Sequence, residues 1–390
     1  MATLAPPALI FFCNSILFVS LFTRLPSIQA GLGVDKAVLG LSLLGAPIGT
    51  LVALSVASRI TERLTPRIAA TLFLAICAVI MPLITVAPIL PFFLLFILYG
   101  FFRTVMDVAT NMIAAGTEHR TGVKVLARSH GFWSVGLLVG SLASGFLAGR
   151  DVSPFLHQAS VSALVLLACL VILRITPRDH SAGEMKTEPK RRPIFIVPDR
   201  TILLICVMVF GICITEGAIY DWGIFFLRER AGADATTAGI IYASFTLGMG
   251  LTRLSGDWLR QRHGTMTLVR GSATLVIVGL TGMLAMPGLV LTGIAFFVIG
   301  CGIALGYPLA VATTIERGRG APADNLAALS LSLMLSTIGV PPALGFVAET
   351  FGLLASFAML LPFALLSFIM APVSQGVRPG LRTGWRRSAR

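Results

Sequence analysis

Long apolar runs separated by short polar segments dominate this chain of 390 residues. A transmembrane helix needs roughly 20 mostly apolar residues. That rule predicts twelve such helices, at 6–26, 37–57, 68–88, 90–114, 131–149, 155–174, 201–227, 237–256, 267–286, 288–313, 326–348 and 352–373. No run alternates with a period of two, so the pattern excludes a membrane β-barrel. We interpret the first run as a helix rather than a signal peptide, because it lacks a basic segment before it and a cleavage site after it.

The basic residues predict the orientation of these helices. Cytoplasmic loops of membrane proteins carry an excess of Lys and Arg. Most of the 30 Lys and Arg residues, with Arg253 counted among them, fall in one alternate set of connections and at the C-terminus. The other set holds few, such as Lys36 and Arg150. Both termini are therefore expected in the cytoplasm.

The longest polar stretch divides the chain into two halves. It includes RDHSAGEMKTEPKRR, and its composition predicts a flexible linker at 176–200. We expect a six-helix bundle at 1–175, a second at 201–373, and a basic cytoplasmic tail at 374–390 beside the anionic inner leaflet.

Composition excludes a soluble domain and argues against a nucleic-acid-binding protein. The chain is 56% hydrophobic and 12% charged, whereas soluble domains carry about 25% charged residues. The net charge of +13 does not indicate nucleic-acid binding, because the basic residues lie between apolar runs and no nucleic-acid motif is present. All six cysteines lie inside apolar runs without metal-ligand spacing. We therefore predict no metal site, no disulfide framework and no cofactor.

The two halves resemble repeats of each other. An offset of 199 places Ile60 and Arg63 of the first half under Leu259 and Arg262 of the second. An offset of 200 aligns the YG of the fourth expected helix with the IG of the tenth. Parallel six-helix repeats are one architecture of membrane transporters.

Twelve helices, the 6+6 division and the segment GDWLRQRHG together resemble the major facilitator superfamily. The family carries a G-x-x-x-D-R-x-G-R-R-like signature in the connection after its second helix. The better copy here follows the eighth expected helix, and the copy in ASRITERLTPR is degraded, with Ser58 in place of the leading glycine. The resemblance implies that these charges brace the two bundles at a cytoplasmic gate. It assigns that role to Glu62, Arg63, Asp257, Arg260 and Arg262.

A narrower resemblance rests on MDVATN, SHGFWSVGLLVGS and EGAIYDWGIFFLRE. These segments are similar to a bacterial branch that includes the rhizopine membrane-transport proteins of rhizobia, and the branch is distantly similar to fucose permeases. Rhizopines are amino-inositol derivatives. The resemblance implies a multi-pass protein of the bacterial inner membrane, expected as a monomer.

Ionisable groups inside membrane helices are costly, so each one is a candidate functional residue. Arg103, Asp107 and Asn111 are spaced i, i+4 and i+8, and they stay within about 80° of arc on one helix. This stripe either binds substrate or protons in a central cavity, or is a self-neutralising pair that fixes helix packing. Arg103 also matches an arginine of some proton-coupled relatives, but Asp107 stands where their glycine is expected.

The seventh expected helix contributes Glu216, Tyr220 and Asp221. Glu216 lies roughly 22 Å along this helix, near the membrane midplane. A carboxyl in a low-dielectric surrounding exchanges protons near neutral pH, so Glu216 is the predicted proton-coupling group. A protonated glutamic acid bonded to a neighbouring helix is the alternative. We predict that Asp221 either joins the site or closes an outer gate with Arg24 or Arg228.

Two further polar side chains are candidates. Asn14 lies mid-depth in the first expected helix, where it binds a hydroxyl of the solute or joins helices. Tyr307 lies in the tenth, between Gly306 and Pro308, where a bend is expected to bring it to the solute.

These features predict a proton-coupled secondary transporter of a small polar solute that works by alternating access. No GxxxxGK[ST] motif for ATP is present, and no nucleophile–base set indicates an enzyme. A non-transporting sensor is a third class. Carboxylates suit an amine and amides suit a polyol, so the best substrate prediction is export of a rhizopine-like amino-polyol. A sugar/proton symporter or a multidrug/proton antiporter is the alternative.

Overall fold

The computed structural model describes residues 4–122, 125–177, 198–285, 288–318 and 322–375, and their regular structure is entirely helical. The first helices along the chain are α1 (Ala5–Phe22), α2 (Leu25–Leu32), α3 (Lys36–Leu43), α4 (Gly45–Leu54), α5 (Ala57–Leu64), α6 (Pro66–Ile84), α7 (Ile89–Thr121), α8 (Leu126–Ala148) and α9 (Pro154–Ile175). The later ones are α10 (Arg200–Phe225), η2 (Phe226–Arg230), α11 (Ala235–His263), α12 (Thr265–Ala285), α13 (Leu289–Ile303), α14 (Gly306–Arg317), α15 (Pro322–Thr337), α16 (Val340–Ala358), α17 (Leu361–Met370) and η3 (Ala371–Ser374).

Ten described helical segments are long and apolar enough to cross a membrane. One of them, residues 324–374, spans 51 residues and changes direction at Gly352, whose φ is 87°, so it contains the last two expected spans. The eighth expected span lies within α11, which has 29 residues and is not one of the ten. The described chain thus supplies a helical rod for every expected span.

Several spans are built from two helices rather than one. The first divides at Thr23 and Arg24, and α2 restarts with a proline in its first turn, a position where the missing N–H costs nothing. The tenth divides between Ile303 and Gly306, which confirms the expected bend.

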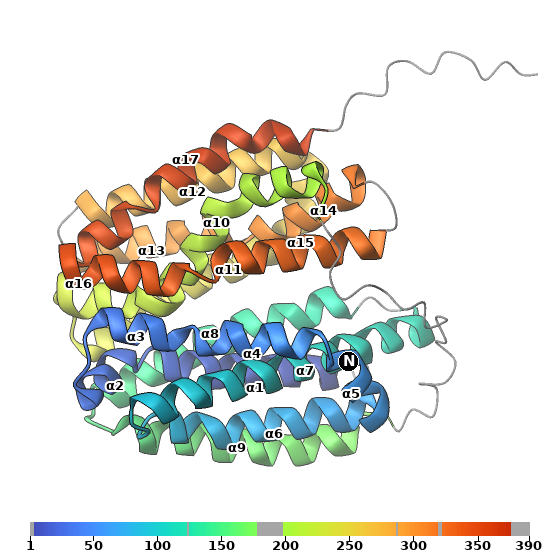
Figure 1. The fold of residues 1–390 in the computed structure, drawn as a ribbon, viewed down its shortest axis with the longest axis horizontal. Helices are drawn as coiled ribbons and strands as arrows, with labels where there is room; N and C mark the ends of the chain where they lie inside the picture. The colour runs from blue at the N-terminus through green and yellow to red at the C-terminus, as the bar shows by residue number, and fades with distance from the viewer. Residues whose placement is uncertain (1–3, 123–124, 178–197, 286–287, 319–321, 376–390) are drawn as a thin grey trace, which may run out of the picture.

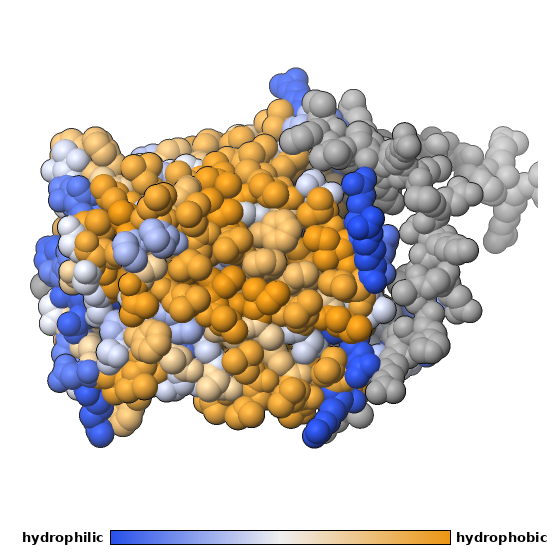
Figure 2. Space-filling view, turned by 60° about the horizontal axis from the view of Figure 1, so that its bottom comes forward, coloured by the Kyte–Doolittle hydropathy of each residue, from blue (hydrophilic) through white to orange (hydrophobic). Residues whose placement is uncertain are grey.

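On the face of the molecule that Figure 2 shows, an apolar belt lies between two polar ends. Many large apolar side chains of the molecule are open to the surroundings, for example Leu164 at 67% and Val290 at 78% exposed. Exposure of such side chains to water is unfavourable, whereas their contact with lipid tails is not. The belt therefore matches the expectation of a membrane protein.

The helices form two groups, α1–α9 and α10–η3, stacked on one another (Figure 1). Helix α8 packs against α11, and α3 packs against α16, across the boundary between the groups. We call the end that holds the start of α1 and the end of α17 the terminal end, and the opposite one the distal end. The ribbons of the two groups lie closer together at the distal end (Figure 1).

Ionic contacts and very close backbone approaches join the groups at the distal end. Lys36 Nζ lies 2.9 Å from a carboxylate oxygen of Glu229, and its backbone N–H donates to Glu349 at 2.9 Å. A Cβ added to Gly239 would lie 2.5 Å from the Cα of Gly145. The distal ends of the two groups are therefore in direct contact in this conformation.

Two segments expected to be loops are helical instead. ASRITERLTPR forms α5 and the start of α6, and most of GDWLRQRHG forms the last turns of α11, which ends at His263. Both segments combine good helix formers with a basic last turn, which is favourable at a helix C-terminus. Arg253, counted above with the cytoplasmic basic residues, consequently lies ten residues before the end of α11.

Candidate functional site

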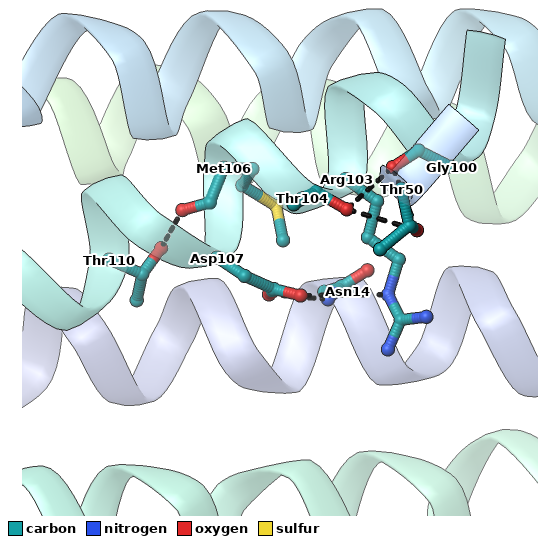
Figure 3. Close-up of polar contacts among 8 residues, drawn as sticks. All are labelled: Asn14, Thr50, Gly100, Arg103, Thr104, Met106, Asp107 and Thr110. Carbon is teal, nitrogen blue, oxygen red and sulfur yellow. Dashed lines mark hydrogen bonds and ion pairs between the residues drawn. The ribbon is translucent and has the colours of Figure 1, made fainter. Parts of the chain in front are cut away.

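Asn14, Arg103 and Asp107 form the first polar cluster, which we call the Asp107 cluster (Figure 3). Arg103 Nε lies 3.8 Å from Asp107 Oδ2, an ion-pair distance that is too long for a hydrogen bond. Asn14 donates from Nδ2 to Asp107 Oδ1 at 3.4 Å. Figure 3 shows Arg103 and Asp107 projecting from α7 toward α1, which carries Asn14.

The Asp107 cluster keeps unused hydrogen-bonding capacity. Asn14 is fully buried, and its Oδ1 has no hydrogen-bond partner among the described residues. Arg103 Nε likewise makes no hydrogen bond with a described residue. The side chains of Arg103 and Asp107 are each 33% exposed. Buried polar groups are normally paired, so this arrangement favours a site that a ligand completes.

Close packing of α7 against α4 orients the Asp107 cluster. A Cβ on Gly100 would lie 2.0 Å from the carbonyl oxygen of Ala46, so only glycine permits this approach. Thr104 then reaches Thr50 at 3.1 Å and the Gly100 carbonyl at 2.8 Å (Figure 3). These contacts fix the rotation of α7 and turn Arg103 and Asp107 toward α1.

Asn111, the third member of the predicted stripe, is exposed and makes no hydrogen bond with the Asp107 cluster among the described residues. It lies four positions after Asp107, which places it one turn further toward the terminal end.

Glu216, Tyr220 and Arg253 form the second cluster, which we call the Glu216 cluster. Arg253 Nη2 donates to Glu216 Oε1 at 3.0 Å, and the Tyr220 hydroxyl donates to the same oxygen at 3.1 Å. Arg253 Nε also donates to the carbonyl of Ala304 at 3.3 Å. The side chains of Glu216 and Arg253 are 22% and 27% exposed. This cluster is tightly paired, in contrast to the Asp107 cluster.

Aromatic side chains connect the two clusters. The Arg103 guanidinium lies 5.2 Å from the Trp133 ring and 5.6 Å from the Phe18 ring, distances typical of cation–π contacts. Phe18 meets Tyr220 edge to face at 5.4 Å between centroids. Phe18 and Trp133 belong to the first helix group and Tyr220 to the second, so the clusters adjoin across the boundary.

Arg253 is the site residue that the sequence analysis missed. It falls inside the expected span 237–256, yet it was counted with the cytoplasmic basic residues. Its position within a predicted membrane span was the signal that would have identified it. With Arg253 included, the charges of the site balance, because the two clusters together carry two arginines and two carboxylates.

The remaining predicted residues lie apart from these clusters. Asp221 follows Tyr220 on α10, and no described residue forms an ion pair with it. Neither arginine considered for an outer gate pairs with Asp221 in this structure: Arg24 donates to His157 and to the Val152 carbonyl, and Arg228 donates to the Ala233 carbonyl.

Tyr307 is 46% exposed and exchanges a hydrogen bond of 3.0 Å with Ser330 on α15. This contact places it near the start of α14 rather than in either cluster.

The residues assigned to the cytoplasmic gate lie near the terminal end. Arg260 forms an ion pair of 2.7 Å with Glu316, which joins α11 to α14 within one group. Arg262 stacks over Trp258 at 5.7 Å. Glu62 and Arg63 are exposed on α5, and the Asp257 side chain is outside the part of the chain that is described.

The described residues include no group of three or more His, Cys, Asp or Glu side chains placed to hold a metal ion. The side chains of the two clusters are suited to ion pairing, hydrogen bonding and proton exchange.

The family model described as Major Facilitator Superfamily matches residues 8–328. The chain is 27% identical over 372 residues to the uncharacterized transporter y4wD of Sinorhizobium fredii, and the matched region covers 93% of this chain and 96% of the relative. It is 25% identical over 353 residues to the membrane protein MosC of Rhizobium meliloti, covering 90% and 85%. The resemblance drawn from the sequence is thereby confirmed at the level of the family, with a distant similarity to MosC.

Solved structures share the fold at low identity. A variant of the nucleoside transporter NupG superposes with a TM-score of 0.75 at 15% identity, covering 96% of this chain and all of that one. The fucose:proton symporter FucP of Escherichia coli gives a TM-score of 0.60 at 15% identity, covering 96% and 98%. At these identities the likeness is one of fold.

Proposed function

The chain belongs to the major facilitator superfamily and is a secondary transporter rather than an enzyme, and we propose that it couples protons to the movement of a small polar solute. The observation that carries the proposal is the meeting of two arginine–carboxylate clusters, one from each helix group, beside Phe18 and Tyr220. A solute bound between them touches both groups at once, as alternating access requires.

We assign solute binding first to the Asp107 cluster. Asn14 Oδ1 has no hydrogen-bond partner and is an acceptor for a hydroxyl group; Arg103 Nε is ion-paired with Asp107 but makes no hydrogen bond, so it is a donor for another. The ion pair of 3.8 Å is loose enough for a cationic amine to approach Asp107 without first breaking a hydrogen bond from Arg103. Trp133 adds a flat face against which the carbon skeleton of a ring packs.

We assign coupling to Glu216, in the tightly paired cluster. Its carboxylate holds Arg253 in this conformation, at 3.0 Å. A proton on Glu216 removes the negative charge and weakens that pair, which frees Arg253 to move relative to α10. Protonation thereby changes a contact between α10 and α11, the helix that packs on α8 of the other group. This link gives the proton a route to the rocking of the groups.

The proposed solute is an amino-polyol of the rhizopine type, and export by proton antiport is the proposed direction. Two carboxylates provide for the amine, and the amide, guanidinium and tyrosine groups provide for hydroxyls. The similarity to MosC over 90% of this chain supports this choice. A sugar/proton symporter is the second candidate, because the described site also carries ring-stacking faces. A multidrug/proton antiporter would rely on phenylalanines such as Phe18.

The proposed setting is the bacterial inner membrane, with both termini in the cytoplasm and one chain as the working unit. In that orientation the joined distal end faces outward, and the conformation is closed to the outside. Glu62, Arg63, Asp257, Arg260 and Arg262 remain the proposed brace of the opposite, cytoplasmic gate.

The test is flux in proteoliposomes with an imposed pH gradient, preceded by a counterflow screen of inositols, amino-polyols, sugars and cationic dyes. Glu216→Gln keeps the side-chain shape, and it should abolish gradient-driven flux while counterflow persists. Asp107→Asn should lose counterflow, because it leaves Arg103 without its counter-ion. Asp324→Asn, a partly exposed acid in the first turn of α15, is the matched control and should behave as wild type.

Two results would contradict these roles. Normal dependence on the pH gradient in Glu216→Gln removes the coupling assignment. Unchanged counterflow in Asp107→Asn removes the solute assignment. A screen in which sugars exchange and amines do not would favour the symporter.

A further inference from the structure

A cavity of about 240 Å³ lies between the two helix groups at the distal end, away from both clusters. We call it the distal cavity. The first group contributes Arg24, Ser27, Ser144 and Asp151 to its wall, and the second contributes residues that include Arg228. Its volume is below the roughly 300–1,000 Å³ of pockets that hold drug-sized ligands, so it suits a small ion or acid.

Arg24 brings a buried positive charge to the distal cavity. It is 4% exposed. Its Nη2 donates to the Val152 carbonyl at 2.7 Å, and its Nε lies 3.3 Å from His157 Nδ1. Neither partner carries a negative charge that would balance the guanidinium, and its Nη1 makes no hydrogen bond with a described residue. A buried charge of this kind calls for a counter-ion.

Arg228 brings a second guanidinium to the same wall from the other group. Its Nη1 lies 3.4 Å from the Ala233 carbonyl, and no described carboxylate pairs with it. Asp151 also lines the cavity, and it is an exposed residue of the turn before α9. With one carboxylate against two guanidinium groups, the lining keeps a net positive charge.

We propose that the distal cavity binds a small oxyanion, a carboxylate or a phosphate, between Arg24 and Arg228. Guanidinium groups pair with such oxygens through two parallel N–H donors. The hydroxyl of Ser27, an exposed residue, supplies a neutral donor on the same wall. The ligand therefore satisfies both the unpaired charge and the free Nη1 of Arg24.

The site has a consequence for conformation, because its two arginines belong to different helix groups. Separation of the groups at the distal end pulls Arg24 and Arg228 apart and divides the site. A ligand that binds one state better shifts the population toward it. The bound oxyanion therefore stabilises the state in which the distal end is joined, whatever solute the central clusters carry.

The experiment measures equilibrium binding of acetate and of inorganic phosphate to the purified full-length protein in detergent, with chloride as the reference salt. Binding is followed by the shift of the thermal unfolding midpoint with ligand concentration. We expect saturable binding of at least one oxyanion in the wild type. Arg228→Gln and Arg24→Lys should each weaken it at least tenfold. Arg228 is exposed, so its variant keeps the test valid if Arg24 variants fold poorly.

Arg150→Gln is the matched control, because Arg150 is an exposed arginine of the same end that stacks over Phe146 at 4.6 Å and does not line the cavity. Equal loss in Arg150→Gln and Arg228→Gln would overturn the proposal as non-specific charge screening. Absence of binding by both oxyanions in the wild type would also overturn it.

A second measurement tests the bridging role. Spin labels at Ala30 on α2 and Thr350 on α16 report the distance across the distal end. The bound oxyanion should increase the population of the short distance, and Arg228→Gln should remove that effect. Binding with no change of this population would overturn the bridging role.

Discussion

The ion pair between Glu216 and Arg253 is the contact whose energy the structure defines best. At 3.0 Å, with an effective dielectric constant of about 20, the direct attraction is about 5.5 kcal/mol. Desolvation offsets much of it, and removal of one partner from a fully buried pair costs about 3–5 kcal/mol. Because the side chains are 22% and 27% exposed, we expect about 2–3 kcal/mol for the loss of one partner.

The perturbation is a double-mutant cycle. Arg253→Met removes the charge and keeps a long unbranched side chain, and Glu216→Gln removes the opposite charge. Each single variant leaves one charge without its partner, whereas the double variant leaves none. The double variant should therefore be more stable than the sum of the single losses predicts, with a coupling energy of about 1–3 kcal/mol. The measurement is the free energy of unfolding in denaturant titrations of the detergent-solubilised protein.

The pair between Arg260 and Glu316 provides the internal comparison. Its distance of 2.7 Å is shorter, but its side chains are 44% and 49% exposed. Exposed pairs contribute about 0–1 kcal/mol because water and salt screen them. We therefore expect a larger coupling energy between Glu216 and Arg253 than between Arg260 and Glu316. A coupling energy between Glu216 and Arg253 that is equal or smaller would contradict this prediction.

Two further predictions concern the joined distal end and the orientation of the protein in the membrane. Gly239→Val should prevent the close approach to Gly145, because even a Cβ added at Gly239 would lie 2.5 Å from the Cα of Gly145. The variant should therefore shift the protein away from the state in which the distal ends are joined. Distance measurements across the distal end test this, and an unchanged distance distribution would contradict it. Cysteines placed at Lys186 and Arg386 should react with impermeant reagents only from the cytoplasmic side, and a cysteine at Asp151 only from outside, because basic loops remain in the cytoplasm. Labelling of the cysteine at Lys186 from outside would contradict the proposed orientation.

The sequence predicted each site contact that lies within a single helix. Arg103 with Asp107, and Glu216 with Tyr220, are both i, i+4 pairs, and residues at this spacing are neighbours on any α-helix. Their partners from other helices were not predicted. Asn14 is 93 positions away from Asp107, and Arg253 is 37 away from Glu216. Such pairing depends on the rotation of one helix against another, which the spacing within one helix does not contain.

Close packing decided other features that composition leaves open. The glycine at position 100 looked like any other small residue in an apolar run, yet its contact with Ala46 sets which face of α7 turns toward α1. Likewise, GDWLRQRHG was expected as a connection because it lies between the expected spans 237–256 and 267–286 and resembles the family's loop signature. It continues α11 because nothing in it breaks a helix before Gly264, whose φ is 71°.

From the amino-acid sequence alone it follows that this protein is embedded in a membrane and crosses it as helices. Apolar runs of this length are stable in lipid rather than in water, and without water the backbone N–H and C=O groups must bond to one another within a helix. Where the charged side chains meet depends on the tertiary structure. Phe18 and Trp133 bring the Asp107 cluster beside the Glu216 cluster, and Arg24 lies across a cavity from Arg228. These juxtapositions come from packing between helices remote in sequence, whose geometry depends on the shape of every side chain at the contact.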